Sequence, residues 1–207
     1  TVDDVNEAPA FSLENVVPFL LESEDTTLGV KVADIIVSDD ALGDNTFTIT
    51  GDDADLFEVS GSELRLVSGA VLDFENNPKL DISINLDDAS VGETPDDTAS
   101  IQIQIVNSND PPEIKNQTFY ITENNDPGAV IGKIKADDPN DGDTLTYAVA
   151  SGNDDGLFLL ASSRGILSLR DGLVLNFESV PNSFELTVNV TDERNLSASV
   201  LVTSVVV

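Results

Sequence analysis

Apolar side chains recur at every second position in four stretches of the chain. These positions are Leu80, Ile82, Ile84 and Leu86; Ile101, Ile103 and Ile105; Leu145, Tyr147 and Val149; and Phe184, Leu186, Val188 and Val190. A period of two predicts β-strands that bury one face. Turn-forming segments around Gly43, Pro78 and Gly152 separate the stretches, and no segment has a helical period with caps. We therefore predict an all-β protein, with Phe57, Phe158 and Tyr147 in its core and Tyr120 exposed.

The chain repeats itself at an offset of about 101 to 104 residues. Five segments recur in the same order: residues 6–9 as 109–112, Glu22 as Glu123, residues 56–57 as 157–158, residues 72–75 as 175–178, and residues 86–88 as 190–192. Ordered repetition at this spacing predicts two homologous domains of about 100 residues. Seven or so short strands in each domain predict an immunoglobulin-like β-sandwich.

We place the boundaries of the domains at the turn-rich segments. Residues 1–9 would end a preceding repeat or linker, residues 10–108 form the first repeat, 109–112 a linker and 113–207 the second repeat. Pro111 and Pro112 stiffen this linker and remove two backbone donors. Because the chain begins inside the repeated motif, at residues 1–4, we expect it to be part of a longer polypeptide.

The charge balance is extreme, with 9 basic and 39 acidic residues and a formal net charge of −30. Such a chain is repelled by nucleic acid and by anionic lipid. No apolar stretch approaches the roughly 20 residues that span a bilayer. We therefore expect no nucleic-acid partner and no direct membrane insertion. Either salt screens these carboxylates, in which case they serve only solubility, or cations bind them.

The residue types that are missing exclude much chemistry. The chain contains no Cys, His, Met or Trp, so zinc, copper, haem and thiol sites lose their usual ligands, and Ser–His–Asp catalysis is excluded. A glycosidase-like pair made by Asp73 and Glu75 is the remaining enzymatic alternative. Few aromatic residues are available to hold a sugar, so we predict no enzyme. Only oxygen ligands remain for a metal, and these suit Ca²⁺.

Many acidic and amide side chains fall at predicted strand ends and turns. The candidate metal ligands are Glu22, Asp73, Glu75, Asn107, Asn109, Asp110, Asp137, Asp138, Asn140 and Asp192. Because the loops of a sandwich gather at its two ends, we expect the Glu22 and Asp73 segments at one end of the first domain. The Asp138 and Asp192 loops would lie at the facing end of the second domain, with the linker between them. Calcium takes about 6–8 oxygen ligands, so this junction could hold more than one ion.

These motifs resemble those of cadherin repeats, and of bacterial cadherin-like repeats in particular. DVNEAPAF (4–11) resembles the inter-repeat connector and LDFE (72–75) the central Asp-x-Glu motif. TENNDPG (122–128) resembles the strand-A glutamate motif, and ADDPNDGDTLTY (136–147) resembles the Asp-rich loop of bacterial cadherin-like repeats. VSDD (37–40) followed by TGDDADLFEV (50–59) is also similar to bacterial members. The resemblance covers nearly the whole chain. It implies two tandem cadherin-type Greek-key β-sandwiches from a large secreted or cell-surface protein.

The same resemblance implies calcium bound between successive repeats. Its ligands would be Glu22, Asp73 and Glu75 from the first repeat, Asn109 and Asp110 from the linker, and Asp138, Asn140 and Asp192 from the second. Asp4, Asn6 and Glu7 would meet Asp39, Asp40 and Asp88 at a junction with a preceding repeat. Glu123, Asn176 and Glu178 would face a following one.

Several positions depart from the family pattern. Asn107 and Asn176 stand where the family usually has Asp, and the loop that contains Asp39 and Asp40 lacks a clear Asp-x-Asp, so both residues stay candidates. Residues 87–97 form an acidic insert that we expect to be a hairpin loop. With fewer charged ligands, the two outer half-sites should bind calcium more weakly than the central one.

Two functions remain open, together with a passive spacer that holds a distant functional domain away from the cell, which the sequence does not separate from the first. The first is an extracellular adhesion or structural module in which Ca²⁺ stiffens the junction between adjacent repeats, with a homophilic partner possible. The second is a carbohydrate-binding module of a secreted polysaccharide-active protein. The absence of Trp and the presence of only two Tyr residues favour the first.

Overall fold

The computed structural model describes residues 5–92, 94–178 and 180–207. The chain divides into two compact units, Thr1–Ser108 and Asn109–Val207, called unit 1 and unit 2 below. Within the described ranges, no helix has the length and apolarity needed to cross a membrane.

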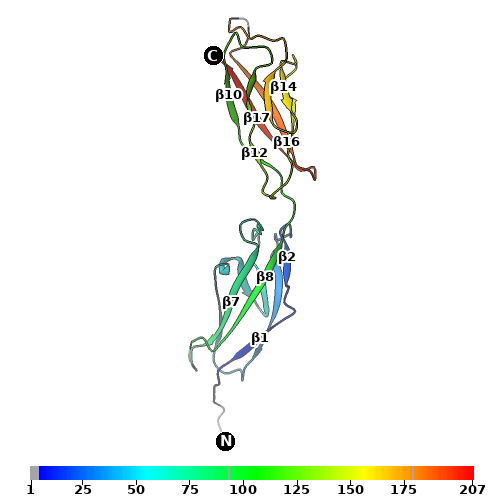
Figure 1. The fold of residues 1–207 in the computed structure, drawn as a ribbon. Coiled ribbons are helices and arrows are strands. Elements are labelled where there is room, and N and C mark those ends of the chain that lie inside the picture. The colour runs from blue at the N-terminus through cyan, green and yellow to red at the C-terminus, as the bar shows by residue number, and fades with distance from the viewer. Residues whose placement is uncertain (1–4, 93, 179) are drawn as a thin grey trace. The chain divides into compact units, whose positions relative to one another are not determined.

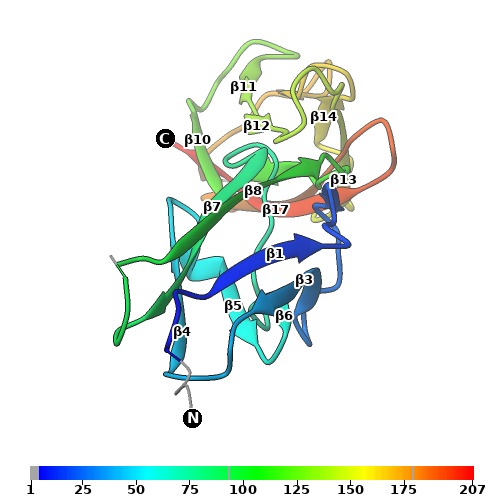
Figure 2. The same ribbon diagram turned by 90° about the horizontal axis from the view of Figure 1, so that it is seen from below.

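Unit 1 is a sandwich of two four-stranded sheets, ordered β1-β3-β6-β5 and β2-β8-β7-β4 (Figures 1 and 2). Its strands are β1 (Ala10–Glu14), β2 (Phe19–Leu21), β3 (Val30–Ser38), β4 (Asn45–Thr50), β5 (Phe57–Ser60), β6 (Glu63–Leu66), β7 (Lys79–Asp88) and β8 (Asp97–Val106). The pair β2–β8 is parallel and the other pairs are antiparallel. The chain leaves one sheet after β1 and joins the other at β2. Asn15, with φ 50°, makes that bend, and the donor-less Pro18 precedes β2.

Unit 2 repeats this topology. Its sheets are β10-β17-β16-β13 and β11-β15-β14, with β9 and β12 forming a short extra pair. The strands are β9 (Glu113–Ile114), β10 (Gln117–Ile121), β11 (Val130–Lys133), β12 (Ala136–Asp137), β13 (Thr146–Ser151), β14 (Phe158–Ala161), β15 (Ile166–Leu169), β16 (Ser183–Thr191) and β17 (Ser197–Val206). The predicted pair of all-β sandwiches is confirmed. Each unit has more than seven strands because its first strand is divided in two, as β1 and β2 in unit 1 and as β9 and β10 in unit 2. In unit 2 the second strand is also divided, as β11 and β12.

The predicted strand periodicity is confirmed in the cores. Strand β7 buries Leu80, Ile82, Ile84 and Leu86, and β16 buries Leu186, Val188 and Val190. Phe57, Phe158 and Tyr147 are buried, whereas Tyr120 is 66% exposed, as predicted. The same phase carries two acids inward at the strand ends, since Asp88 and Asp192 follow the last apolar residues by two positions and are also buried.

Two local features differ from the sequence prediction. A single 3-10 turn, η1 (Ala54–Leu56), precedes β5; at three residues it is too short to show a helical period. The acidic insert is a hairpin loop, but its ends belong to strands, because Asp87 and Asp88 complete β7 and Asp97 begins β8. The Asp96 side chain accepts a hydrogen bond from the Asp88 amide at 2.6 Å and so extends the pairing beyond Leu86.

The cores of the two units are packed differently around one position. The Glu22 amide bonds to the Val106 carbonyl in unit 1, and the Glu123 amide bonds to the Val207 carbonyl in unit 2. These equivalent bonds align the last strands of the two units, so that Ser204 in unit 2 corresponds to Ile103 in unit 1. Its neighbours across β10 and β16 are Phe119 and Phe184. Both rings are bulky, so a small residue fits between them. The buried Ser204 hydroxyl has no hydrogen-bond partner among the described residues.

We therefore expect Ser204→Ala to raise the free energy of unfolding of unit 2 by about 1 kcal/mol, because it removes an unsatisfied buried hydroxyl. Both tyrosines lie in unit 2, so urea unfolding followed by tyrosine fluorescence reports on this unit. The control is Ser199→Ala, which removes an outward hydroxyl that bonds to Asn189. A loss of stability in Ser204→Ala would show that the hydroxyl is satisfied.

Candidate metal centre

Three carboxylates gather at one end of unit 1, and we call them the Glu22 cluster. Glu22, Asp73 and Glu75 each offer an oxygen within 4.8 Å of the others. Glu22 follows β2, where its amide bonds to the Val106 carbonyl. Its carboxylate accepts the Phe74 amide at 2.7 Å and the Ser108 amide at 3.1 Å. This glutamate therefore holds both the Asp73 turn and the chain after β8.

A tight turn orients the other two acids of the Glu22 cluster. The Asn76 side chain and amide donate to the two oxygens of Asp73 at 2.7 and 2.8 Å. These bonds, the side-chain one first, lower the pKa of Asp73. Glu75 is exposed and accepts a bond from the Asn107 side chain at 2.8 Å. The bonded Asp73 keeps its negative charge at neutral pH and is able to bind a cation.

A second group, the Asp138 cluster, lies in unit 2. Asp138, Asp143 and Asp192 each present an oxygen within 4.8 Å of the others. Asp192 is only 4% exposed, and it accepts the amides of Arg194 and Leu196 and, at 2.6 Å, the Asn109 side chain. Burial acts to raise the pKa of Asp192, but these hydrogen bonds outweigh burial and lower it.

Two oxygens of the Asp138 cluster are buried with no donor among the described residues, namely Oδ2 of Asp138 and Oδ2 of Asp143. The other oxygen of Asp138 accepts the Asn140 amide at 3.0 Å. Burial raises the pKa of Asp138 against this hydrogen bond, and the charges of Asp143 and Asp192 raise it further. Unsatisfied buried carboxylate oxygens are costly unless a cation neutralises them. The residues present therefore fit a hard cation.

Linker residues contribute to the Asp138 cluster as well. Asn140 is 6% exposed, and its side-chain oxygen accepts the Asp110 amide at 2.6 Å. Asn109 donates to Asp192 and accepts from Arg194. Carboxylates, side-chain amides and backbone carbonyls are the ligands that calcium uses, whereas the softer metals prefer nitrogen or sulfur.

A third group lies at the other end of unit 1, around Asp88. The Asn6 side chain donates to Asp88 at 3.0 Å and to Ser90 at 2.6 Å. Asp88 also accepts the Ser90 amide, the first of the hydrogen bonds that lower its pKa. Side-chain oxygens of Asn6 and Asp39 are buried and lack partners among the described residues. The two oxygens of Asp40 accept the Glu7 and Leu42 amides, so Asp39 has the available oxygen. Asp4 lies outside the described residues.

The remaining predicted ligands are placed differently. Asp137 is exposed on β12, opposite Glu113, and is not part of the Asp138 cluster. Glu123 accepts the Phe177 amide at 3.3 Å, as Glu22 accepts that of Phe74. Asn176, however, uses its oxygen to accept the Glu178 amide, so this end carries one carboxylate fewer. Asp143 was not among the predicted ligands. Its position five residues after Asp138, in a loop that contains a glycine, is the sequence feature that could have identified it.

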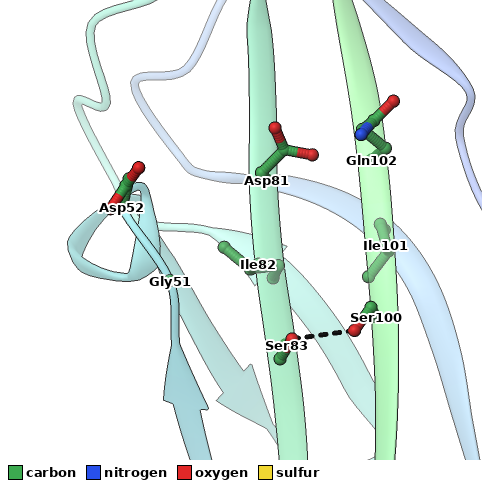
Figure 3. A pocket seen from close by; sticks show the side chains of 8 residues that line it. All are labelled: Gly51, Asp52, Asp81, Ile82, Ser83, Ser100, Ile101 and Gln102. Carbon is green, nitrogen blue, oxygen red and sulfur yellow. Dashed lines mark hydrogen bonds between the residues drawn. The ribbon is translucent and has the colours of Figure 1, made fainter.

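A shallow hollow of about 610 Å³ lies away from these clusters, on the outer face of β7 and β8. Figure 3 shows its lining, in which Asp81 and Gln102 lie on β7 and β8 two residues along from a hydrogen-bonded Ser83–Ser100 pair of 2.8 Å. Its lining residues include no aromatic ring and no member of the three groups. Sugar sites stack their ligand on aromatic rings, so this hollow does not favour a glycan.

We expect Asp138→Asn to stabilise unit 2 by about 1 kcal/mol in EGTA, because the amide removes a like charge and donates to an unpaired oxygen. In calcium the same variant should lose most of the stabilisation that the ion gives the wild type. Urea unfolding followed by tyrosine fluorescence measures both. Asp141→Asn is the matched control, since it removes the same charge from an exposed position of the loop. Equal behaviour of the two variants would contradict a cation site at Asp138.

Gly43→Ala should destabilise unit 1 by about 1–3 kcal/mol more than Gly61→Ala. Both glycines have positive φ, 75° and 62°, so both alanines are strained in the same way. A Cβ on Gly43 would meet the carboxylate of Asp88 and the Asn6 amide, whereas one on Gly61 meets nothing within 4 Å. Differential scanning calorimetry of the two variants tests this difference. Equal losses of stability would show that Asp88 and Asn6 move away from the added methyl group without destabilising unit 1.

Comparison with known proteins places these features in a family context. No protein-family model matches the chain. Human cadherin EGF LAG seven-pass G-type receptor 2 is 28% identical over 184 residues, which is 84% of this chain and 6% of that protein. Human protocadherin gamma-B4 is 29% identical over 215 residues, or 96% of this chain and 23% of the relative. The chain thus spans less than a quarter of the length of these relatives.

Solved structures show the same fold. The human protocadherin-24 EC1-2 structure (form II) aligns with a TM-score of 0.61 at 20% identity, covering 97% of this chain and 98% of that one. The protocadherin gammaB7 EC3-6 cis-dimer structure aligns with a TM-score of 0.60 at 23% identity, covering 98% and 51%. The two units therefore have the fold of these protocadherin extracellular domains. The relatives named here are animal proteins and do not support the bacterial part of the resemblance.

Proposed function

We propose that these two cadherin-like domains form a calcium-binding adhesion module of an extracellular or cell-surface protein, in which calcium fixes each domain against its neighbour. The observation that carries the proposal is a pair of buried oxygens, on Asp138 and Asp143, that have no hydrogen-bond partner among the described residues and lie beside the buried Asp192. Calcium supplies the positive charge that lets these carboxylates stay ionised side by side. Adjacent repeats of the same chain are then its first partners.

The ligand set of the central site comes from both units and the linker. It comprises Glu22, Asp73, Glu75 and Asn107; Asn109 and Asp110; and Asp138, Asn140, Asp143 and Asp192. A second set, Asn6, Asp39 and Asp88, with Asp40 as the alternative to Asp39, would serve a junction with a preceding repeat. Glu123, Asn176 and Glu178 would serve a following one, more weakly. Extracellular modules of this kind bind calcium at about 10⁻⁴–10⁻³ M.

The linker supports the sharing of ions between the two clusters. The Ser108 amide donates to Glu22, and the side chain of the next residue, Asn109, donates to Asp192. One peptide bond therefore separates a residue held by the first cluster from a residue held by the second. Pro111 and Pro112 follow and limit the conformations of the chain. A linker this short cannot act as a flexible tether.

An adhesion role fits the chain better than a carbohydrate-binding one. The relatives carry the names of cadherins and protocadherins, and the hollow on unit 1 offers no ring to a sugar. The chain contains no Cys and no His, and the proposal includes no enzymatic activity. The adhesion role places the module outside the cell or at its surface, and this location is part of the proposal.

A double-mutant cycle in calcium affinity tests whether ions are shared. Titration calorimetry compares the wild type with Glu75→Gln, Asp138→Asn and the double variant. If one site draws on both clusters, each single variant weakens it and the two losses are not additive. Glu58→Gln and Asp141→Asn, at exposed positions of β5 and the Asp138 loop, are the controls. Additive losses would assign the ions to separate units, and the absence of any heat of binding would overturn the calcium proposal.

Small-angle scattering tests the stiffening of the junction. In about 1–5 mM calcium, above the expected dissociation constants, the pair of units should have a narrow distribution of interatomic distances. In EGTA this distribution should broaden, and Asp138→Asn should behave in calcium as the wild type does in EGTA. Identical curves with and without calcium would leave the clusters as binding sites that do not stiffen the junction.

A further inference from the structure

Arg194 is a basic residue that lies beside the Asp138 cluster. It follows the buried Asp192 by two positions, in the turn between β16 and β17, and its amide donates to Asp192 at 2.9 Å. Its guanidinium donates to the side-chain oxygen of Asn109 at 2.8 Å. The surrounding groups are acids and amides, so the positive charge of Arg194 stands next to the place where a metal ion would supply one.

Two hydrogen bonds fix the direction in which the Asn109 side chain points. Its nitrogen donates to Oδ2 of Asp192 at 2.6 Å, and its oxygen accepts from Arg194. A carboxylate only accepts hydrogen bonds and a guanidinium only donates them, so the reversed amide would lose both bonds. One oxygen of Asn109 and one of Asp192 are thus already occupied by protein donors, and both residues belong to the ligand set proposed for calcium.

Unit 1 offers an internal comparison, because the repeated segments of the two units align and place Ser90 where unit 2 has Arg194. The Asn6 nitrogen donates to Oδ2 of Asp88 at 3.0 Å, as the Asn109 nitrogen does to its aspartate. The Ser90 hydroxyl accepts from the same Asn6 nitrogen at 2.6 Å, and the Asn6 oxygen is buried with no hydrogen-bond partner among the described residues. The asparagine oxygen that Arg194 covers in unit 2 is therefore open in unit 1.

The charge of Arg194 also acts on the carboxylates of the cluster. Burial is the main cause that raises the pKa of Asp138, and the charges of Asp143 and Asp192 raise it further. The hydrogen bond from Asn140 and the charge of Arg194 lower the same pKa. The guanidinium is therefore near enough to offset part of the repulsion among the three acids. A cation this near also repels a divalent ion, although solvent reduces the repulsion because Arg194 is exposed.

A calcium ion that uses the Asn109 oxygen has to displace the guanidinium from it. Arg194 is exposed and has a long side chain, so it is free to turn into solvent when the ion arrives. The hydrogen bond that it gives up is replaced by bonds to water, and the net free energy of that exchange is small. Displacement is therefore feasible, but its cost and the repulsion between the two positive charges both lower the affinity for the ion.

We propose that Arg194 is a tethered competitor of calcium, which partly neutralises the Asp138 cluster in the absence of the ion and lowers the affinity of unit 2 for it. The inference rests on the calcium role proposed above and concerns the regulation of the same site. The competitor helps unit 2 to stay folded when calcium is scarce, and it moves calcium binding to higher concentrations of the ion. Ser90 carries no charge, so the Asp88 group of unit 1 has no such competitor at this position.

Urea unfolding of the whole chain, followed by tyrosine fluorescence at a series of calcium concentrations, measures both effects in unit 2. Arg194→Ser introduces the residue that unit 1 has at this position. In EGTA this variant should have a lower urea midpoint, because a counter-charge and a hydrogen bond are lost. The apparent dissociation constant for calcium, obtained from the dependence of the midpoint on calcium concentration, should fall at least about threefold. Arg194→Lys keeps a cation and should stay within about twofold of the wild-type constant.

Arg164→Ser is the matched control, since it removes the same charge from an exposed turn of unit 2. Equal midpoints of Arg194→Ser and Arg164→Ser in EGTA, or equal calcium affinities, would overturn the inference and leave the calcium role intact. Weaker calcium binding by Arg194→Ser would also overturn it, because Arg194 would then support the site rather than compete for it. A gain in affinity by Arg194→Lys as large as that of Arg194→Ser would exclude competition by charge. A wild type that gains no stability from calcium would overturn the calcium role and the inference with it.

Discussion

Repulsion between carboxylates held close together is the constraint on which this molecule depends. Three acids in each of two clusters present oxygens within 4.8 Å of one another, and in the Asp138 cluster two carboxylate oxygens are buried without a donor among the described residues. Such a group is stable as the free protein only if a proton or a cation neutralises it. The raised pKa of Asp138 expresses the same fact. A bound cation removes this repulsion, so the stability of each unit should depend on the concentration of that cation.

The strands, rather than the loops alone, create this conflict. Asp88 and Asp192 continue the inward phase of β7 and β16 by one step beyond the last core residue. A carboxylate there has no freedom to turn toward solvent without breaking the alternation that buries Leu86 or Val190. Hydrogen bonds from Ser90 and from Arg194 and Leu196 hold each one in place. The core thus supplies the rigidity that a metal site needs, and the consequence is that negative charges are buried close together.

Sequence patterns predicted the parts of this structure that follow from periodicity and repetition. The alternation of Leu80 to Leu86 and of Leu186 to Val190 is enough to orient the strands, and the ordered anchors reveal two domains. Three features escaped. Asp143 is brought to Asp138 by a loop with Gly142 at φ 94°, a conformation that no periodicity encodes. The choice between Asp39 and Asp40 depends on which oxygen the Glu7 and Leu42 amides take. Ser204 reads as a break in an apolar strand, although the rings of Phe119 and Phe184 account for it.

The two units also use their charged residues in different ways. Acids placed at strand ends cluster and need a cation, whereas acids spread over the sheets of unit 1 take up all three of its basic residues in local pairs. Unit 2 has fewer acids and twice as many basic residues, and the Gln117 side chain bonds to the backbone of two of them, Lys115 and Lys135. A local ion pair would neutralise such lysines at little cost, since acids are plentiful. The basic residues of unit 2 nevertheless form no ion pair within the described part of the chain, so the two units differ in how their charges are paired although their cores share one topology.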